Sequence, residues 1–448
     1  MAAVPIPGPT GHPVFGMARE LRRDPLATLL GNFKRHGDIV VYRIGPARGP
    51  RRLRRRIVAV HHPEAVQRVL SDAQVFSRLA GPLRAVREMF GENLVTADGE
   101  AWQRQRRALQ PIFTRNRIAD YSEAMEAEAR RVVGDLAVAG EVVDVAGLVE
   151  VYTLRVLGRT LFKGPAELDE RTVADFGRLV PLVGRAIRSR AVLALRPPLA
   201  WPTPANRRFA RTHDELYAVV DRVLDSRSRS NPPSAGEDLL ARLQAVREPE
   251  TGQAFSAEEV RDQALMFLLA GHTTTTSALT SALYLLGRHP EIQERVAEAA
   301  ASSPAPSPEE DPVVAAVMEA MRLYPPSSML ARRVLVDAQL DGRLVPAGSH
   351  VVVSAWVTHR HPEFWRAPEE FDPRRFIGAA ARPRYAYFPF GGGVRTCIGR
   401  HFALVESAIL LRELLRSYRL LALDAELPVA QLASLRPSGP VRVKFERR

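Results

Sequence analysis

The chain contains a single cysteine, Cys397, which lies in a glycine-rich segment before a long amphipathic stretch. Three consecutive glycines at 391–393 allow the backbone to turn tightly and to approach a flat ligand. The stretch after Gly399 has helical apolar spacing, which places Cys397 beside the positive end of a helix. Amide donors and this helix end lower a thiol pKa and favour a thiolate, which is a metal ligand. A small core residue is the usual alternative for a lone cysteine.

Two pairs of side chains are spaced to share one face of a helix. Glu319 and Arg322 are three residues apart and can form a bidentate ion pair, although most such pairs lie on a helix surface. Trp102 and Arg106 are four residues apart, so an indole N–H and a guanidinium face the same side. Paired donors of this kind suit a carboxylate, whereas core packing is the alternative for Trp102.

Residues 270–276 read AGHTTTT and lie inside a longer helical pattern. The pattern opens with a capping box at Ser256–Glu259 and continues to about Gly287. Glycine and consecutive threonines are poor helix formers, and threonine side chains compete for the backbone hydrogen bonds. We therefore expect a local widening of the helix here, with room for oxygen and water.

Three motifs in this chain resemble those of the cytochrome P-450 family. Phe390–Gly399 reads FGGGVRTCIG and resembles the haem-binding signature Phe-x-x-Gly-x-Arg-x-Cys-x-Gly. Glu319–Arg322 resembles Glu-x-x-Arg, and residues 371–376, FDPRRF, resemble the later segment whose arginine, here Arg375, joins that pair in a buried triad that locks the fold. The motifs follow the family's order, and the resemblance covers essentially the whole chain.

This resemblance implies a mainly α fold, the cytochrome P-450 fold, with a large helical body and a small β-sheet lobe. A proline- and glycine-rich arm at 1–20 would precede one haem-thiolate monooxygenase domain at 21–448. Heme b (iron protoporphyrin IX) would lie between the long distal helix and the Cys397 loop, with Cys397 as the iron ligand. Haem contacts are expected from Ala270, Gly271, Phe390, Gly391 and Gly399. The haem propionates are assigned to Trp102, Arg106, Arg332 and Arg395, with Arg333 as the alternative to Arg332.

The family's distal segment usually reads Ala-Gly-x-acid-Thr, in which the acid and the alcohol deliver protons during oxygen activation. Here the alcohol aligns with Thr274, and Thr273 stands at the position of the acid, so both are expected catalytic residues with an altered proton route. His272 is the alternative proton donor, because imidazole titrates near neutrality. It points about 100° away from Thr273 around the helix, which disfavours that role.

The implied activity is insertion of one oxygen atom of O2 into a lipophilic small molecule, a terpenoid, polyketide or fatty acid of secondary metabolism. The substrate is expected between the long helix, the loop near residues 77–96 and residues 327–330. The expected pocket residues are Ala270, Thr273, Ser328, Met329 and Leu330. Because Thr273 replaces the acid, the alternative is an atypical outcome on the same fold, peroxide-driven oxidation or oxidative coupling.

Electrons from NAD(P)H are expected through a separate ferredoxin and ferredoxin reductase, because the sequence contains no flavin or ferredoxin segment. The chain has 63 Lys+Arg against 50 Asp+Glu, a formal charge of +13, which suits an acidic ferredoxin on a basic face around Arg395 and Arg400. The same charge admits an arginine-rich nucleic-acid-binding protein. The run Arg51–Arg56 has no interleaved aromatic residue for base stacking, which favours a solvated loop and no nucleic-acid partner.

Composition and local patterns predict the secondary structure that must position these residues. With 448 residues, 46% hydrophobic and 25% charged, the chain is globular, and one cysteine excludes an intrachain disulfide. The β-branched runs at 38–44 and 57–60 predict a hairpin, and residues 98–300 are mainly helical. Short strands return at 333–353, with a tight turn at Asp341–Gly342.

Several other classes of protein are disfavoured by the sequence. No segment reaches the roughly 18 to 20 apolar residues of a membrane span, and the N-terminus lacks the pattern of a signal peptide. A soluble, cytoplasmic monomer is therefore expected. The sequence has no phosphate loop, nucleophile elbow or dinucleotide fingerprint. The pairs His61–His62 and His359–His361 are interpreted as surface residues rather than metal ligands.

Overall fold

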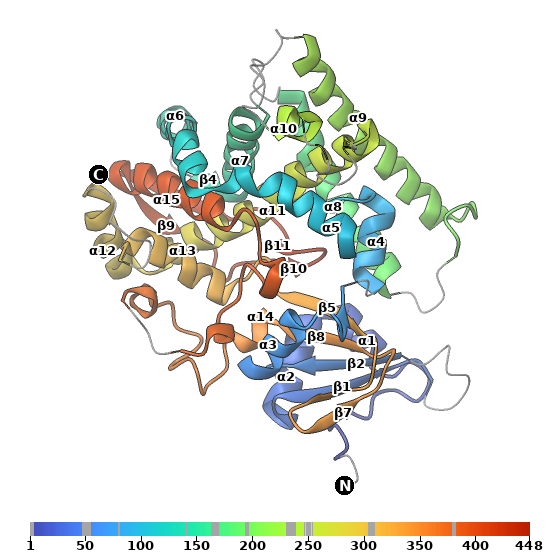
Figure 1. Cartoon of the computed structure of the whole chain (residues 1–448). Coiled ribbons are helices and arrows are strands. Elements are labelled where there is room, and N and C mark those ends of the chain that lie inside the picture. Colours follow the sequence, from blue (N-terminus) through green and yellow to red (C-terminus); the bar gives the residue numbers. More distant parts are fainter. Residues whose placement is uncertain are drawn as a thin grey trace.

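The computed structural model contains a large helical body beside a smaller sheet lobe (Figure 1), which confirms the predicted mainly α fold. Of the arginine run at 51–56, only Arg55 and Arg56 are described, so the expected solvated loop lies outside the described residues. The structure describes residues 4–46, 55–78, 81–139, 142–162, 170–192, 197–229, 239–245, 247, 252, 254–302, 310–378 and 382–448.

The sheet lobe is built on a five-stranded sheet in the order β1-β2-β8-β5-β3. The predicted hairpin is present, because β1 (Ile39–Ile44) pairs antiparallel with β2 (Arg55–Val60). β8 (His350–Ser354) pairs in parallel with β2 and antiparallel with β5 (Met329–Val334). β3 (Phe76–Ser77) pairs with β5 at the edge, so segments that are far apart in sequence meet in one sheet.

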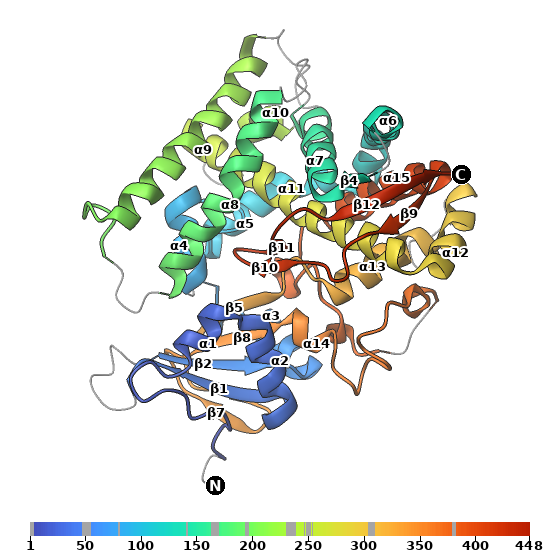
Figure 2. The ribbon, with the colours of Figure 1, turned by 180° about the vertical axis from the view of Figure 1, so that it is seen from behind.

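Side chains alternate across this sheet, so that each face packs against a helix. Val40 and Tyr42 pack in one cluster with α2 (Pro25–His36), and Val41 packs in another with α3 (Pro63–Ser71). The N-terminal arm runs along β1, where the Val41 N–H donates to the carbonyl of Pro7 (2.8 Å), and leads into α1 (Ala18–Arg23). Figure 2 shows these blue elements together from behind.

Smaller sheets complete the strands that the structure describes. β6 (Ala338–Leu340) and β7 (Arg343–Val345) form a hairpin, and its turn residues Asp341 and Gly342 have positive φ angles of 49° and 67°, as the sequence predicts. The others are β4 (Val142–Asp144), β12 (Arg442–Arg447) and β9 (Tyr418–Ala422) in one sheet, and β10 (Val429–Gln431) and β11 (Leu435–Pro437) in another.

The helical body surrounds α11 (Ala257–Arg288), a largely buried helix that runs through its middle (Figure 2). None of the described helices is both long and apolar enough to cross a membrane. The remaining helices are α4 (Gly81–Phe90), α5 (Gly99–Leu109), α6 (Arg115–Ala139), α7 (Val145–Leu161), α8 (Glu170–Val192), α9 (Pro204–Arg229), α10 (Leu239–Ala245), α12 (Pro290–Ala301), α13 (Pro312–Leu323), α14 (Ala355–Thr358) and α15 (Arg400–Ser417).

The predicted capping box opens α11: Ser256 Oγ accepts from the Glu259 N–H (3.1 Å), and the Glu259 carboxylate accepts from the Ser256 N–H (2.8 Å). The helix stays α-helical through residues 270–276, so the expected local widening is not found. The hydroxyls of Thr273 and Thr274 each donate to the carbonyl four residues earlier (2.7 Å). These bonds satisfy the threonine side chains without opening the backbone ladder.

Candidate active site

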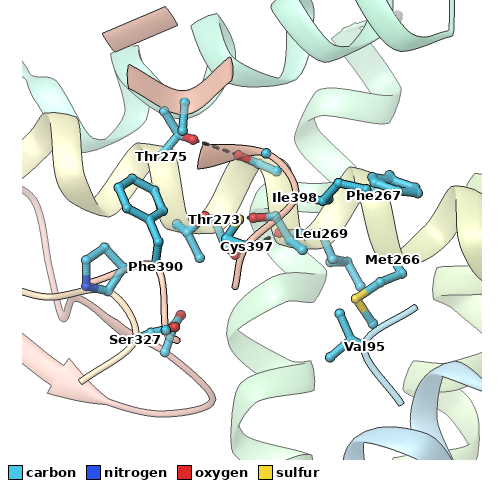
Figure 3. A pocket seen from close by; sticks show the side chains of 18 of the residues that line it. Val95, Met266, Phe267, Leu269, Thr273, Thr275, Ser327, Phe390, Cys397 and Ile398 are labelled. Atoms are coloured by element: carbon cyan, nitrogen blue, oxygen red, sulfur yellow. Dashed lines mark hydrogen bonds between the residues drawn. The ribbon is translucent and has the colours of Figure 1, made fainter. Parts of the chain in front are cut away.

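A cavity of about 450 Å³ lies between the middle of α11 and the loop that carries Cys397 (Figure 3). Thr273 lines it from α11, and Phe390 and Cys397 line it from the loop. Leu330 of β5 and residues of α4, α5, α7 and α8 complete the wall. The cavity therefore brings together the cysteine motif and the threonine segment that the sequence singles out.

The Cys397 loop has a backbone that favours glycine at two positions. Gly391 and Gly393 have φ angles of 72° and 66°, and a Cβ on Gly393 would lie 2.4 Å from the carbonyl oxygen of Leu70. The Cys397 N–H donates to the carbonyl of Phe390 (2.9 Å), which closes the loop. α15 begins three residues after Cys397, as the amphipathic pattern predicts.

Cys397 is exposed at the surface of the cavity, and the protein around it partly removes the thiol from water. Burial raises the pKa of Cys397 above its ordinary value, while the Gly399 amide, Arg106 and Arg400 act in the opposite direction. The expectation of a lowered thiol pKa is therefore wrong. Desolvation of the buried sulfur outweighs the amide donor and the nearby guanidinium groups.

Three arginines, Arg78, Arg332 and Arg395, line the cavity as one cluster. Burial first, and repulsion between neighbouring guanidinium groups second, lower the pKa of each to about 10. Asp98 is the acidic side chain that acts on all three, so the cluster carries excess positive charge. Arg332 is buried and lines the cavity, whereas Arg333, the alternative that the sequence leaves open, is exposed.

Trp102 and Arg106 lie beside this cluster on the cavity wall. The guanidinium of Arg395 lies 3.9 Å from the Trp102 ring centre, and Arg106 Nη1 donates to the carbonyl of Thr396 (3.1 Å). The Arg395 side chain is only 9% exposed. It therefore cannot contribute to the exposed basic face that the sequence predicts around Arg395 and Arg400, whereas Arg400 is exposed.

These residues fit the haem that the family resemblance implies. The thiol of Cys397 would supply the iron ligand as a thiolate, and the excess charge of Arg78, Arg332 and Arg395 would suit the two carboxylates of haem. The sequence patterns do not identify Arg78. Its place follows from the antiparallel pairing of Ser77 with Arg333, which sets Arg78 opposite Arg332, and no local pattern signals that pairing.

The threonine segment presents only part of its polar surface to the cavity. Ala270, Gly271, Thr273 and Thr274 line the cavity, as expected. His272 is buried on another side of α11, where its Nε2 lies 3.3 Å from a Glu150 carboxylate oxygen of α7. The direction of His272 removes it from the cavity, in agreement with the helical spacing.

Only some residues of the predicted pocket segment at and just before β5 line the cavity. Leu330 and Ser327, the two ends of the expected stretch 327–330, line the cavity. Ser328 and Met329 are not among the lining residues, so their assignment is wrong. The Ser328 hydroxyl donates to the side-chain oxygen of Gln431, and Met329 packs against a core cluster of the sheet lobe.

Glu319 and Arg322 form the buried bidentate pair that their spacing predicts, with N–O distances of 2.7 and 2.8 Å. Arg375 Nε lies 3.4 Å from the same carboxylate, which completes the triad. The remaining donors of Arg322 are bound by the carbonyls of His359, Pro368 and Glu370, so all five of its N–H donors are engaged. The triad thus joins α13 to the long segment that precedes the Cys397 loop.

The histidine pairs are placed differently from the surface position that the sequence suggests. His61 and His359 are fully buried, and His361 is nearly so, with its Nε2 2.8 Å from an Asp38 carboxylate oxygen. His359 Nε2 accepts from the Phe388 N–H (2.9 Å). The described residues contain no group of three His, Cys, Asp or Glu side chains suited to a metal ion.

Comparison with known proteins agrees with this geometry. Residues 6–445 match the family model described as Cytochrome P-450. Cyclooctat-9-en-7-ol 5-monooxygenase of Streptomyces melanosporofaciens is 34% identical over 421 residues, which is 92% of this chain and 88% of that protein. Pentalenene oxygenase of Streptomyces avermitilis is 30% identical over 456 residues, 98% of this chain and 97% of that protein. The chain therefore belongs to the cytochrome P-450 family of haem-containing monooxygenases.

Proposed function

We propose that the protein inserts one oxygen atom of O2 into a hydrocarbon-rich small molecule of the terpenoid class, with electrons from a separate protein. The observation that carries this proposal is the apolar wall of the cavity. Most of this wall consists of hydrocarbon side chains, among them Val86, Phe90, Leu157, Val183 and Ile187. Burial of apolar ligand surface against such a wall contributes about 25 cal/mol of binding free energy for each Å² that leaves water. A charged metabolite would lose its hydration there without gaining a polar partner.

The printed names of two relatives support this substrate class. Cyclooctat-9-en-7-ol 5-monooxygenase is named for an alkenol, and pentalenene oxygenase is named for an alkene. Both names describe molecules that are mainly hydrocarbon. A wall of aliphatic and aromatic side chains suits such molecules better than it suits polar metabolites.

Haem bound by Cys397 would supply the activation of O2 and the transfer of one oxygen atom. On the α11 side of the cavity, side chains of the protein would deliver protons. The Thr274 hydroxyl donates to the carbonyl of Ala270 (2.7 Å), so its hydrogen must leave that carbonyl before it can donate into the cavity. Thr273 does not ionise near neutral pH as a carboxylic acid does, so protons must reach Thr274 through ordered water.

An acidic ferredoxin is the proposed electron donor. Arg400 and Arg115 are both exposed, and their charges act together on His401, directly after the Cys397 loop. Arg400 is also among the charges that act on Cys397 itself. A basic surface this close to the proposed iron ligand attracts an acidic partner and keeps the path for electrons short.

The proposal is tested with haem-loaded protein, ferredoxin, ferredoxin reductase and NAD(P)H under isotopically labelled O2. Mass spectrometry of a terpenoid library should find products that carry one labelled oxygen atom. Oxidation of fatty acids or polyketides, with every terpenoid unchanged, would contradict the proposed substrate class.

Peroxide-driven oxidation is the second candidate, because Thr273 stands where the family usually has an acid. Unlabelled hydrogen peroxide, added under labelled O2 without ferredoxin, separates the two candidates. Rapid formation of unlabelled product, with little product from the ferredoxin system, would favour the peroxide route.

A further inference from the structure

We propose that Arg436 is a polar anchor in the substrate cavity, and that the substrate carries an oxygen atom that accepts a hydrogen bond from its guanidinium group. This inference rests on the proposed function, because it takes the apolar cavity to be the substrate site. The shared chemistry is an oxygen acceptor on a mainly hydrocarbon molecule, supplied by an alcohol or by a carboxylate.

The first observation is a buried donor without an acceptor. Arg436 lies on β11 and lines the cavity, and its Nη1 is buried with no hydrogen-bond partner in the described part of the chain. Buried polar groups in folded proteins almost always have a partner, and a charged donor without one is costly. A cationic donor on the cavity wall whose Nη1 no acceptor of the described chain satisfies therefore indicates a ligand that brings the acceptor.

The second observation is the rigidity of the backbone that carries Arg436. The Leu435 N–H donates to the carbonyl of Pro326 (2.8 Å), and Arg188 of α8 donates to the carbonyl of Gln431 at the start of the turn. A Cβ on Gly184 would lie 3.2 Å from the Cβ of Leu432, so α8 also packs closely against this hairpin. The hairpin thus fixes the backbone at Arg436 before a ligand binds, so only the side chain has to be ordered on binding.

The charges around Arg436 leave it available to a ligand. Burial lowers the pKa of Arg436, while Glu150 raises it and Arg185 lowers it. Glu150 is bound to His272, and the structure gives no ion pair between Glu150 and Arg436 within the described residues. Arg185 is exposed. Arg78, Arg332 and Arg395 are not among the charges that act on Arg436, so this donor is separate from the haem-propionate cluster.

The test measures binding to haem-loaded protein by calorimetry with three ligands that share one ring: cyclododecane, cyclododecanol and cyclododecanecarboxylic acid. The variants are Arg436→Met, which keeps length without charge, and Arg436→Lys, which keeps the charge. Arg333→Met is the matched control, because Arg333 is exposed and does not line the cavity. Thermal unfolding of each variant checks that the fold is retained.

We expect the wild-type protein to bind the alcohol or the acid about tenfold to a hundredfold more tightly than the hydrocarbon, as a hydrogen bond to a charged donor predicts. Arg436→Met should abolish this preference and leave hydrocarbon binding unchanged, Arg436→Lys should retain part of it, and Arg333→Met should behave as wild type. The ligand with the larger loss in Arg436→Met identifies the source of the oxygen acceptor.

Two outcomes would overturn the inference in different ways. If wild type and Arg436→Met bind the hydrocarbon equally and show the same ratio of affinities for the oxygenated ligands, Arg436 is not an anchor and the proposed function stands. If wild type binds none of the three ligands, the cavity does not bind hydrocarbon-rich molecules, and the proposed substrate class fails together with the anchor.

Discussion

The guanidinium carbon of Arg395 lies over Trp102, 3.9 Å from its ring centre, so a cation–π contact joins the Cys397 loop to α5. Arg395 Nη2 also donates to Asp98 at 2.5 Å, directly before α5. The desolvated contact is worth roughly 2 kcal/mol or more by analogy with similar pairs. It orients Arg395 beside Arg78 and Arg332, where the three charges repel one another until an anion is bound.

We expect Arg78→Met to have opposite effects on the haem-free and haem-loaded proteins. Without haem, removal of one repelling charge should leave the melting temperature unchanged or raise it. With haem, loss of a carboxylate partner should increase haem dissociation about tenfold or more. The measurements are calorimetric melting of the haem-free protein and haem transfer to a scavenger protein. Exposed Arg333→Met is the control, and equal haem loss from both variants would contradict the cluster's role.

Glu319→Ala and Arg322→Ala should each lower the free energy of unfolding by roughly 3 to 5 kcal/mol, because each strands a buried charge. That is a large part of the roughly 5 to 15 kcal/mol typical of folded proteins. Denaturant unfolding and the yield of haem-loaded protein measure the effect. Arg374→Ala is the matched control, because its pair with Asp372 is exposed at the arginine. Normal stability of the two buried variants would show that the triad does not lock the fold.

His61 should make the protein less stable in acid. Burial lowers its pKa to about 3, and neither ring nitrogen has a hydrogen-bond partner among the described residues. Between this value and the ordinary pKa of about 6.5, the unfolded chain binds a proton that the folded chain excludes. Stability should therefore fall by up to about 1.4 kcal/mol for each pH unit from 6.5 downward.

His61→Phe should remove this part of the pH dependence, since its ring can pack beside Phe33 without titrating. Urea unfolding of both proteins at several pH values below 7 measures the difference. His213→Gln, at a partly exposed histidine of α9, serves as the control. An identical slope in wild type and His61→Phe would rule out His61 as the source.

Thr274→Ala should leave substrate binding nearly unchanged and divert electrons to hydrogen peroxide, because it removes the hydroxyl that, once released from the Ala270 carbonyl, could donate into the cavity. Thr273→Glu should raise the ratio of product to NAD(P)H consumed, provided that proton supply limits the reaction. The control is Thr276→Val, whose hydroxyl lies 3.0 Å from that of Thr153, away from the cavity lining. Unchanged ratios in Thr274→Ala and Thr273→Glu would favour the peroxide route.

Arg400→Gln should slow reduction by an acidic ferredoxin at low salt, and the difference from wild type should vanish at high salt. Exposed charges are screened over about 10 Å at 0.1 M salt and about 3 Å at 1 M. Stopped-flow reduction at several ionic strengths tests this, with Arg208→Gln on the exposed side of α9 as the control. A rate that does not respond to salt in wild type would count against an acidic partner.

Local patterns predict local structure well in this chain. The capping box of α11, the hairpin of β1 and β2 and the Asp341–Gly342 turn depend on neighbouring residues, and each is found. The spacing of Glu319 and Arg322 likewise predicts their pairing. The spacing alone does not predict that both side chains are completely buried. That expectation comes from the family resemblance.

The errors arise where distant segments decide the outcome. Arg78 joins the cavity through a strand pairing that connects parts of the chain about 250 residues apart, and Ser328, just before β5, is bound by Gln431, about 100 residues later in the chain. The pKa of Cys397 depends on how deeply tertiary packing buries the sulfur, which no sequence window records. The surface position predicted for His61, His359 and His361 is wrong for the same reason, because tertiary packing buries them.

The hydrogen bonds of Arg322 make the connection between α13 and residues 359–370 rigid. Any shift of residues 359–370 against α13 must break several hydrogen bonds to one guanidinium, and His359 extends this rigid region to Phe388 beside the Cys397 loop. The loop of residues 92–96 is attached separately to α11, where the Glu92 N–H donates to Asp262 and the Leu94 N–H donates to Gln263. Changes at the apolar wall of the cavity need not, therefore, alter the surface beside the Cys397 loop where we propose that the electron donor binds.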